Sequence, residues 1–364
     1  MKTVVITGVT GQDGSYMVEF LLANTNHKIV GVVRHSTKPH LAYLNQSLKN
    51  ERFSLETADL ADSHSINRVV KKHTPDYFIN LAAQSFVGSS WDSPEHTFDI
   101  DAVGVLRCLE AVRHYAPECR FYNAGSSEEY GDVQFSPQNE NHPYRARSPY
   151  GAAKISARQI VKVYRESYNL YALQGLLFNH ESPRRGDLFV TRKITKQVAQ
   201  IKDALDKGQQ PQPVVLGNLE SSRDWSHAED MVRGIWMMMN QEVCNPTFKG
   251  ENRDLQEYVF ASGRTHTIRE FIELSFKTAG IDIKDTNPQR LEPIQDDKAE
   301  QVNYIGNGQA LVTVSTKFFR PAEVNLLLGD PSRAKHELGW RPLHTFEGLV
   351  TEMVKSDIAL TKGV

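Results

Sequence analysis

TVVITGVTGQDGSYMVEFLLANT, residues 3–25, is the stretch that decides the fold of this chain. It begins with a continuous apolar run, which is typical of a parallel strand covered on both faces. It ends with helical periodicity, and Gly8, Gly11 and Gly14 lie between these two parts. Glycines allow a tight turn and let backbone N–H groups approach a phosphate at the positive end of the following helix. The stretch therefore predicts a strand, a phosphate-binding loop and a helix.

The alternation of strand and helix patterns continues to about residue 178. It predicts an α/β fold with a doubly wound parallel (Rossmann) sheet and right-handed crossovers. Beyond about residue 185 the rhythm loosens: 214–217 and 258–263 are expected strands, 267–280 is an expected helix, and 245–258 and 284–316 are expected irregular insertions. We expect a dinucleotide-binding domain over 1–185, which later segments are free to re-enter, and a smaller C-terminal α/β substrate lobe over 186–364.

Composition excludes several classes of protein. The chain has 364 residues, of which 40% are hydrophobic, and a formal net charge of −2, without a basic run that would indicate nucleic-acid binding. Its three cysteines, Cys108, Cys119 and Cys244, form no CxxC motif, which favours a reducing cytosol over a disulfide framework. The apolar run at the start is too short for a signal peptide, and no stretch is long enough to span a membrane. We therefore expect a soluble cytoplasmic protein. The 13 histidines show no HExxH motif, so we expect no metal site.

The end of the second expected strand bears on the type of dinucleotide. It reads VVRHS, with Arg34 where an acidic residue would accept a hydrogen bond from the ribose of NAD. An arginine instead neutralises the 2′-phosphate of NADP, with His35 and Ser36 as possible helpers. The sequence favours NADP as cofactor, and a solvated basic loop is the alternative.

Other candidate cofactor contacts follow the expected strands and the glycine loop. Asp59 has two interpretations, a contact to the adenine or an N-cap of the next helix. Small residues at 80–85 end the fourth strand, where a cofactor can pass close to the backbone. The remaining candidates in these segments are Thr10, Gln12, Asp13, Leu60, Leu81, Ala82 and Ala83.

The candidate catalytic residues come from two segments. Tyr150 and Lys154 lie four residues apart at the start of an expected helix, so their side chains share one face. An ammonium near a phenol favours the phenolate and lowers the tyrosine pKa, which makes the tyrosine a usable acid and base. Upstream, NAGSSEEYG at 123–131 ends the fifth expected strand, at the edge where open α/β folds bind ligands. There Ser126 offers a hydroxyl and Glu128 a carboxylate.

The two adjacent glutamates of this stretch cannot both point inward in extended geometry. A solvated turn is the alternative for each, and it is the preferred interpretation for Glu129. Glu128 is the expected inward carboxylate.

At this point the chain resembles the GDP-mannose 4,6-dehydratase family of the extended short-chain dehydrogenase/reductases. The resemblance rests on GVTGQDGSY, NLAAQSFV, SSEEYG, RSPYGAAK, LFNHESPRRGDLFVTRKIT, LGNLESSRDW, FFRPAEV and LLGDPSRAK, in order over nearly the whole chain. It implies that Tyr150 takes the proton of the sugar C4 hydroxyl, with support from Lys154, as hydride passes to tightly bound NADP. Glu128 then removes the C5 proton, Glu128 and Ser126 assist loss of water from C6, and hydride returns to C6.

The resemblance also implies binding residues and partners. Ser85, Asn179, Lys193, Arg223, Arg320 and Glu323 would hold the GDP-sugar, because cations pair with a diphosphate and a carboxylate accepts from guanine. His180 and Arg185 would lie near the nicotinamide and the cofactor phosphates. We expect a homodimer or homotetramer that binds neither membrane nor nucleic acid.

Several positions depart from the family pattern. Ser126 replaces Thr, Glu129 replaces Leu, Phe86 replaces His and His96 replaces Tyr, and the loop after Arg34 lacks the arginine- and serine-rich sequence that contacts a neighbouring subunit in relatives. The alternatives are a dehydratase of a larger GDP-sugar such as a GDP-manno-heptose, a GDP-sugar epimerase or reductase, and a non-catalytic NADP sensor on the same fold.

Overall fold

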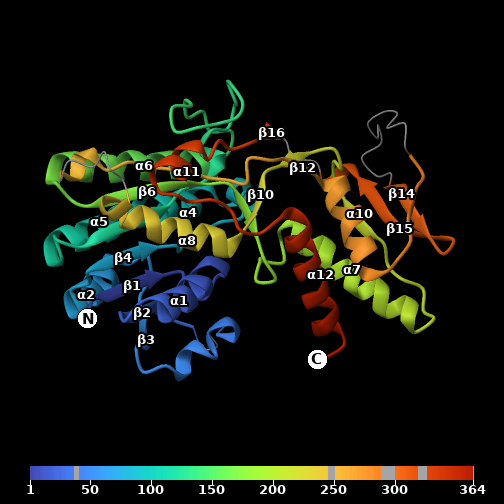
Figure 1. Ribbon diagram of the computed structural model, residues 1–364, viewed down its shortest axis with the longest axis horizontal. Coiled ribbons are helices and arrows are strands. Elements are labelled where there is room, and N and C mark those ends of the chain that lie inside the picture. The colour runs from blue at the N-terminus through green and yellow to red at the C-terminus, as the bar shows by residue number, and fades with distance from the viewer. Residues whose placement is uncertain (37–40, 245–250, 288–299, 319–325, 364) are drawn as a thin grey trace.

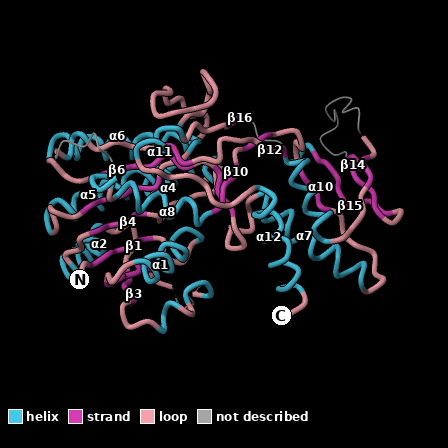
Figure 2. The backbone as a smooth tube through the Cα atoms, viewed as in Figure 1, coloured by secondary structure: helices cyan, strands magenta, loops and turns pink. Residues whose placement is uncertain are grey.

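A computed structural model describes residues 1–36, 41–244, 251–287, 300–318 and 326–363. The chain forms a large lobe, which holds the N-terminus, and a small lobe, in which the last helix runs to the C-terminus (Figure 1). Figure 2 shows that the strands of the large lobe lie between layers of helices, whereas those of the small lobe lie to one side of its helices.

The large lobe is built on a parallel sheet. Its strands, seven in the described ranges, pair in the order β11-β6-β5-β4-β1-β2-β3, which is the doubly wound arrangement. Their bounds are β1 (Thr3–Thr7), β2 (Lys28–Val33), β3 (Phe53–Thr57), β4 (Tyr77–Asn80), β5 (Arg120–Ala124), β6 (Ala172–Leu177) and β11 (Val259–Phe260). The Rossmann expectation is confirmed.

Two apolar cores cover the faces of this sheet. On one face lie α1 (Gln12–Asn24), α8 (Ala228–Met239) and α11 (Ser332–Glu337). On the other face lie α2 (Ser63–His73), α5 (Gly104–Tyr115) and α6 (Pro149–Tyr168). Because β11, α8 and α11 come from the second half of the chain, later segments return to the large lobe after the chain has entered the small one.

The small lobe packs three helices against a mixed sheet. The helices are α7 (Val190–Asp206), α10 (Ile268–Ala279) and α12 (Phe346–Thr361), which share one apolar core. The sheet has four strands within the described residues, in the order β13 (Lys284–Asp285), β14 (Glu300–Gly306), β15 (Gln309–Ser315) and β8 (Val214–Leu216).

The sequence interpretation of 284–316 as an irregular insertion is wrong where the structure describes it. β14 and β15 form an antiparallel hairpin across Asn307 and Gly308, whose φ angles are 51° and 75°. An Asn-Gly pair favours positive φ at both central residues of a two-residue hairpin turn. This pair was the signal that the sequence interpretation missed.

Short strands and helices complete the described fold. Two small sheets pair β10 (Trp225–His227) with β7 (Asn179–Glu181), and β9 (Ser222–Arg223) with β12 (His266–Thr267) and β16 (Leu326–Leu327). The short helices are α3 (Ser89–Asp92), α4 (Pro94–Phe98), α9 (Gln241–Cys244), η1 (Ala42–Leu44), η2 (Ser47–Lys49), η4 (Ser127–Glu129), η5 (Asn252–Asp254), η6 (Thr316–Phe318) and the π-helical η3 (Asp99–Val103). Among the described residues, no helix is both long and apolar enough to cross a bilayer.

Candidate active site

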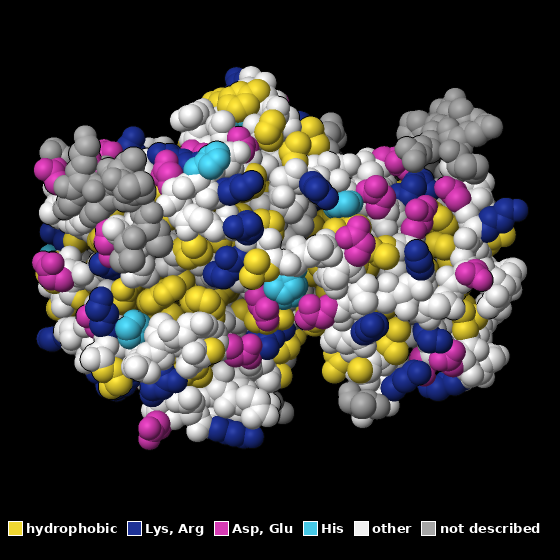
Figure 3. Space-filling view, viewed as in Figure 1, with side chains coloured by type: hydrophobic (Ala, Val, Ile, Leu, Met, Phe, Trp, Pro, Cys, Tyr) yellow, Lys and Arg dark blue, Asp and Glu magenta, His cyan; other side chains and the backbone are white. Residues whose placement is uncertain are grey.

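A cleft of about 1350 Å³ runs along the carboxyl ends of the parallel strands and continues between the two lobes. Figure 3 shows the surface hollowed between the lobes at the lower edge of the view. Ligands of open α/β sheets bind at this edge, outside the strand ends. The cleft is therefore the candidate active site, and its wall comes from both lobes.

The glycine loop forms one end of the cleft and fits a dinucleotide. Gly8 has φ +67°, and a Cβ there would lie 2.6 Å from Ala82 N. A Cβ on Gly14 would lie 2.3 Å from the Gly8 carbonyl oxygen, so glycine alone lets α1 begin this close to the loop. The N–H groups at the start of α1 thus stand at the cleft wall, where backbone dipoles favour an anion.

A charged pair fixes this loop to β7. His180 Nδ1 contacts the Phe178 carbonyl oxygen at 2.7 Å, and His180 Nε2 contacts Asp13 Oδ2 at 2.8 Å. Both partners are acceptors, so both ring nitrogens must donate and the ring is an imidazolium. Although burial lowers the pKa of His180, the Asp13 carboxylate outweighs it and the pKa is raised. Burial raises the pKa of Asp13, but His180 opposes this and the net pKa is lowered.

Most of the predicted cofactor residues meet in the cleft. Arg34 lines the cleft, whereas His35 and Ser36 are exposed and do not. Asp59 lines it too, and Asp62 rather than Asp59 caps α2 by accepting from His64 N at 2.9 Å, so the N-cap interpretation of Asp59 is wrong. The other predicted cofactor residues in the wall are Gly8, Thr10, Gly11, Gln12, Asp13, Gly14, Leu60, Leu81, Ala82, Ala83, Tyr150, Lys154, His180 and Arg185.

Helix α6 presents the tyrosine and the lysine together. Ser148 Oγ accepts from Gly151 N at 3.0 Å and Pro149 occupies the first turn, which starts the helix just before Tyr150. The Lys154 ammonium lies 5.6 Å from the centre of the Tyr150 ring and donates to the Ala124 carbonyl oxygen at 2.9 Å. The predicted common face is confirmed.

The serine and glutamate meet the tyrosine from the end of β5. Ser126 is the N-cap of the turn η4, and its hydroxyl accepts from Glu128 N at 3.2 Å. Ser126, Glu128, Tyr150 and Lys154 all line the cleft. The segments that the sequence pointed to therefore converge on one place.

The electrostatics at Tyr150 differ from the expectation. Burial, followed by the negative charge of Asp101, raises the pKa of Tyr150 above its ordinary value of 10.0, and a hydrogen bond with Ser126 opposes the rise. Lys154 was expected to lower the pKa of Tyr150, but in the structure without bound ligands this pKa is raised.

Asp101 is a residue that sequence reasoning missed. It is 1% exposed on η3, and Oδ1 accepts from Gln84 N at 2.7 Å. Burial raises the pKa of Asp101 and the Lys154 ammonium opposes this. π-helical turns often occur at functional sites. The sequence pattern does not show such a turn between α4 and α5; only the three-dimensional structure does.

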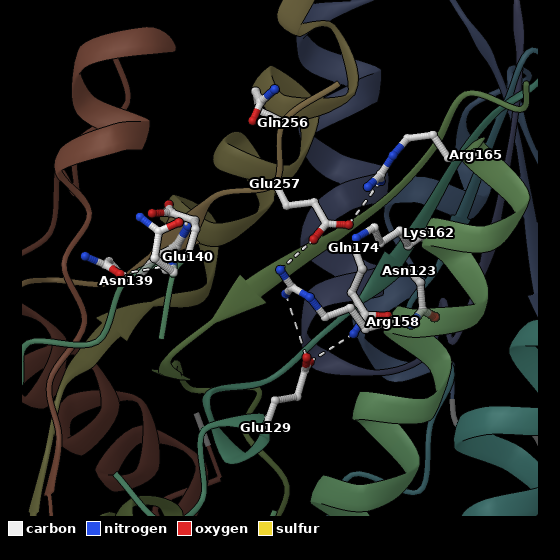
Figure 4. A network of polar contacts seen from close by, with 12 residues as sticks. Asn123, Glu129, Asn139, Glu140, Arg158, Lys162, Arg165, Gln174, Gln256 and Glu257 are labelled. Carbon is white, nitrogen blue, oxygen red and sulfur yellow. Dashed lines mark hydrogen bonds and ion pairs between the residues drawn. The ribbon is translucent and has the colours of Figure 1, made fainter. Parts of the chain in front are cut away.

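Glu129 corrects a second expectation, since it is not in a solvated turn. It is 0% exposed and points into the interior, where it meets Gln174 and Arg158 (Figure 4). The segment is a 3₁₀ turn rather than an extended strand, so the two neighbouring glutamates leave the backbone in different directions.

The predicted substrate residues are only partly gathered. Ser85, Asn179 and Arg223 line the cleft, and the buried Asn179 Oδ1 has no hydrogen-bond partner among the described residues. Lys193 lies outside the wall, where it donates to the Val215 carbonyl oxygen at 2.7 Å and covers Phe318. Arg320 and Glu323 lie outside the described residues. The departures Phe86 and His96 both line the cleft.

One group in the described ranges has metal-like spacing, His227, Glu229 and His344. His227 Nδ1 accepts from Glu229 N at 3.1 Å, so the neutral ring carries its proton on Nε2, which lies 3.2 Å from Glu352. A nitrogen that carries a proton cannot ligate. The group is therefore explained by its own hydrogen bonds and does not fit a metal ion.

The Rossmann sheet, the glycine loop and the Ser–Tyr–Lys set define an enzyme of the extended short-chain dehydrogenase/reductase class. The profile of the family described as GDP-mannose 4,6 dehydratase matches residues 5–353. The chain belongs to the GDP-mannose 4,6-dehydratase family.

Relatives agree with this assignment. The GDP-mannose 4,6-dehydratase of Yersinia enterocolitica is 44% identical, over 100% of this chain and 95% of its own length. The human GDP-mannose 4,6 dehydratase is 41% identical, over 99% and 92%. Among solved structures, dTDP-glucose 4,6-dehydratase from Bacillus anthracis in complex with NAD has a TM-score of 0.74 at 18% identity, covering 98% of this chain and 96% of that one. RMD from Pseudomonas aeruginosa complexed with NADPH also has a TM-score of 0.74, at 21% identity, covering 99% and 100%.

Proposed function

We propose that the protein converts GDP-D-mannose to GDP-4-keto-6-deoxy-D-mannose and water. The observation that carries this proposal is Glu128, a carboxylate in the same cleft as Ser126, Tyr150 and Lys154. Alcohol oxidation needs the hydroxyl, the phenol and the ammonium, whereas loss of water also needs a base for a C–H proton. Family membership and relatives of 41–44% identity support the choice of substrate.

In the proposed mechanism Tyr150 accepts the proton of the sugar C4 hydroxyl, and Ser126 hydrogen-bonds to the same oxygen. Lys154 stabilises the phenolate form of Tyr150 that accepts this proton. The chemistry that a bound nicotinamide supplies is reversible hydride acceptance. Once C4 is a ketone, the C5 proton is acidic, and Glu128 removes it while the C6 hydroxyl leaves as water with a proton from the site. Tyr150 and Glu128 together take up two protons. One of these leaves in the water and the other returns to C5 as the hydride returns to C6, so the net change is the loss of one water.

We propose that the cofactor is NADP and that the two lobes bind different ligands. Arg34 stands in the cleft wall after β2, where a guanidinium suits a 2′-phosphate. The large lobe would hold the dinucleotide through the glycine loop and His180, and the small-lobe side would hold the GDP moiety through Asn179 and Arg223. Family resemblance makes Lys193, Arg320 and Glu323 further candidates for binding GDP.

We also propose a cytosolic homo-oligomer. Cys108 and Cys119 are buried free thiols, as a reducing compartment allows. We place the contact with a second copy at α5 and α6, where Tyr115, Val163 and Tyr168 are exposed.

The test incubates purified protein with GDP-mannose and no added cofactor, and follows the nucleotide-sugar by mass. We expect a product lighter by one water, and NADP rather than NAD released on denaturation. Glu128→Gln should reduce the rate by about 10²–10⁴-fold, the usual contribution of a positioned acid–base group, while retaining the dinucleotide. A Glu128→Gln enzyme that turns over normally would show that another group removes the C5 proton.

A further inference from the structure

Glu129 has no part in the mechanism above, although it adjoins the proposed base. Its Oε1 accepts from Ser126 N at 2.8 Å, while the Ser126 hydroxyl accepts from Glu128 N at 3.2 Å. These two bonds form a capping box that closes η4 on itself. We propose that Glu129 is a positioning residue for the reaction, whose carboxylate locks the turn that carries Ser126 and Glu128 to the helix that carries Tyr150 and Lys154. This inference rests on the proposed function, because the chemistry it positions is the dehydration.

The link from Glu129 to the helix runs through two side chains. Gln174 Nε2 donates to Glu129 Oε1 at 2.9 Å and to the backbone oxygen of Lys154 at 3.2 Å. Arg158 lies one turn beyond Lys154 on α6, and its Nη1 is 3.8 Å from Glu129 Oε2. Figure 4 shows Gln174 and Arg158 converging on the Glu129 carboxylate from β6 and α6. Glu129 therefore joins the two halves of the proposed catalytic set.

The surroundings leave room for this carboxylate. A Cβ on Gly125 would lie 2.6 Å from Glu129 Oε1 and 2.4 Å from the Gly175 carbonyl oxygen, so glycine at 125 makes the space. Gln174 is itself held by a row of polar side chains at the strand ends: Asn123 Nδ2 donates to Gln174 Oε1 at 2.6 Å, and Asn80 Nδ2 to Asn123 Oδ1 at 2.7 Å. The acceptor of Gln174 is occupied by this row, so its amide group must donate toward Glu129.

Charges continue outward from the site. Arg158 Nη2 lies 2.6 Å from Glu257 Oε2, and Arg165 Nη1 lies 3.1 Å from Glu257 Oε1. Glu257 is thus in the same network, where its carboxylate pairs with Arg158 and Arg165 and not with Glu129. It offers a matched control for the loss of a buried carboxylate.

The protonation of Glu129 changes in the neutral range. Burial raises the pKa of Glu129 to about 7, opposed by Arg158, Ser126 N, Gln174 and Lys154. Burial, with a smaller contribution from the negative charge of Glu129, raises the pKa of the nearby phenols. The titratable and charged groups that face it or lie across Arg158 are Arg158, Lys154, Tyr122, Tyr130, Tyr144, Tyr150 and Glu257.

Only the ionised carboxylate gives charge-assisted hydrogen bonds to Ser126 N and Gln174. The turn is therefore held most firmly above the pKa of Glu129, and kcat should fall as the pH drops through about 7. Stability has the opposite sign, because a raised acid pKa contributes stability below 4.5 that is lost as the pH rises through about 7.

The test compares Glu129→Gln, Glu129→Leu and Glu257→Gln with the wild type. Glu129→Gln keeps an acceptor oxygen but no charge, so we expect kcat to fall about tenfold, as one charge-assisted bond implies. KM should be unchanged, and the decrease of kcat with falling pH near neutrality should be absent. Glu129→Leu should lose more, and adding Arg158→Met should restore melting temperature without restoring kcat. Glu257→Gln should lower stability, but its kcat and the decrease of kcat with falling pH should stay as in the wild type.

A readout that does not need turnover separates this inference from the proposed function. Backbone hydrogen exchange over 126–130 should speed up in Glu129→Leu and stay as in the wild type in Glu257→Gln, whatever the substrate proves to be. A wild type inactive on GDP-mannose would refute the proposed function alone. The positioning role would be refuted if the Glu129 variants kept the wild-type kcat, pH dependence of kcat and backbone hydrogen exchange. It would also be refuted if Glu257→Gln changed these quantities equally.

Discussion

The large lobe and the small lobe place their buried polar side chains differently. In the large lobe, Thr7, Asn80, Asn123 and Gln174 are direct register partners on β1, β4, β5 and β6, and they hydrogen-bond in a row just inside the cleft. In the small lobe, the buried Arg269 donates at 2.8 Å to Glu220, Asp285 and Tyr304, and none of these four residues lines the cleft.

The difference teaches what each network stabilises. The row in the large lobe ends at Glu129 and at the backbone of Lys154, so its loss should disturb chemistry before it disturbs folding. The small-lobe network joins α10 to its neighbours in the sheet, so its loss should lower the free energy of unfolding and leave the chemistry unchanged. Buried polar groups need their partners in either lobe, because an unsatisfied one costs about 1–3 kcal/mol.

The largest expected effect lies at the strand-end site. Tyr150→Phe removes one hydroxyl from the cleft, so kcat should fall by about 10²–10⁴-fold, as for loss of an acid–base group. KM, dinucleotide content and melting temperature should change little. Steady-state kinetics and thermal unfolding check this. A large drop in melting temperature with the same loss of kcat would mean that the site and the fold are not separable here.

An intermediate effect is expected at the cofactor loop. His180→Gln removes an imidazolium that donates to Asp13, so dinucleotide release should speed up by about tenfold for one charged bond. Because the folded-state pKa of His180 is raised, its contribution is complete below 6.5 and is lost as the pH rises through the higher folded value. The difference between variant and wild type should therefore shrink as the pH rises. The fluorescence of the reduced dinucleotide, loaded into both proteins, measures its release.

His142 provides the matched control. It is 1% exposed, its Nδ1 donates to Pro143 O at 2.7 Å, and its Nε2 accepts from Gln134 N at 2.9 Å, so this buried ring is neutral. His142→Gln should lower stability without a pH-dependent change in dinucleotide release. If both variants released the dinucleotide alike, the charge on His180 would not be the cause.

The smallest effect is expected in the small lobe. Gly308 has φ +75°, and a Cβ at this position would have no neighbour within 4 Å among the described residues, so Gly308→Ala meets strain but no clash with them. The expected loss of stability is about 1 kcal/mol, with kcat and KM unchanged. Chemical denaturation and kinetics measure both. A fall in kcat would show that the hairpin β14–β15 is coupled to the cleft, and would break the contrast between the lobes.

Much of the site could be predicted from the sequence because its signals are local. The glycine spacing and the Tyr150–Lys154 interval each report a short segment, and the parallel sheet brings the strand ends together. The Asn307–Gly308 turn was equally local and was overlooked. Asp101 could not be found this way, because its place opposite Lys154 depends on a π-helical turn within a continuous helix.

The sequence by itself determined the alternation of elements, the phosphate loop and the family, since periodicity and glycine placement act over a few residues. Only the tertiary structure decided that Glu129, the neighbour of the cleft carboxylate Glu128, is buried and not solvated. Glu129 is held by Gln174, 45 residues later in the chain, and by Arg158. The physical reason is that a carboxylate is buried only where donors and cations from distant segments compensate for its lost hydration.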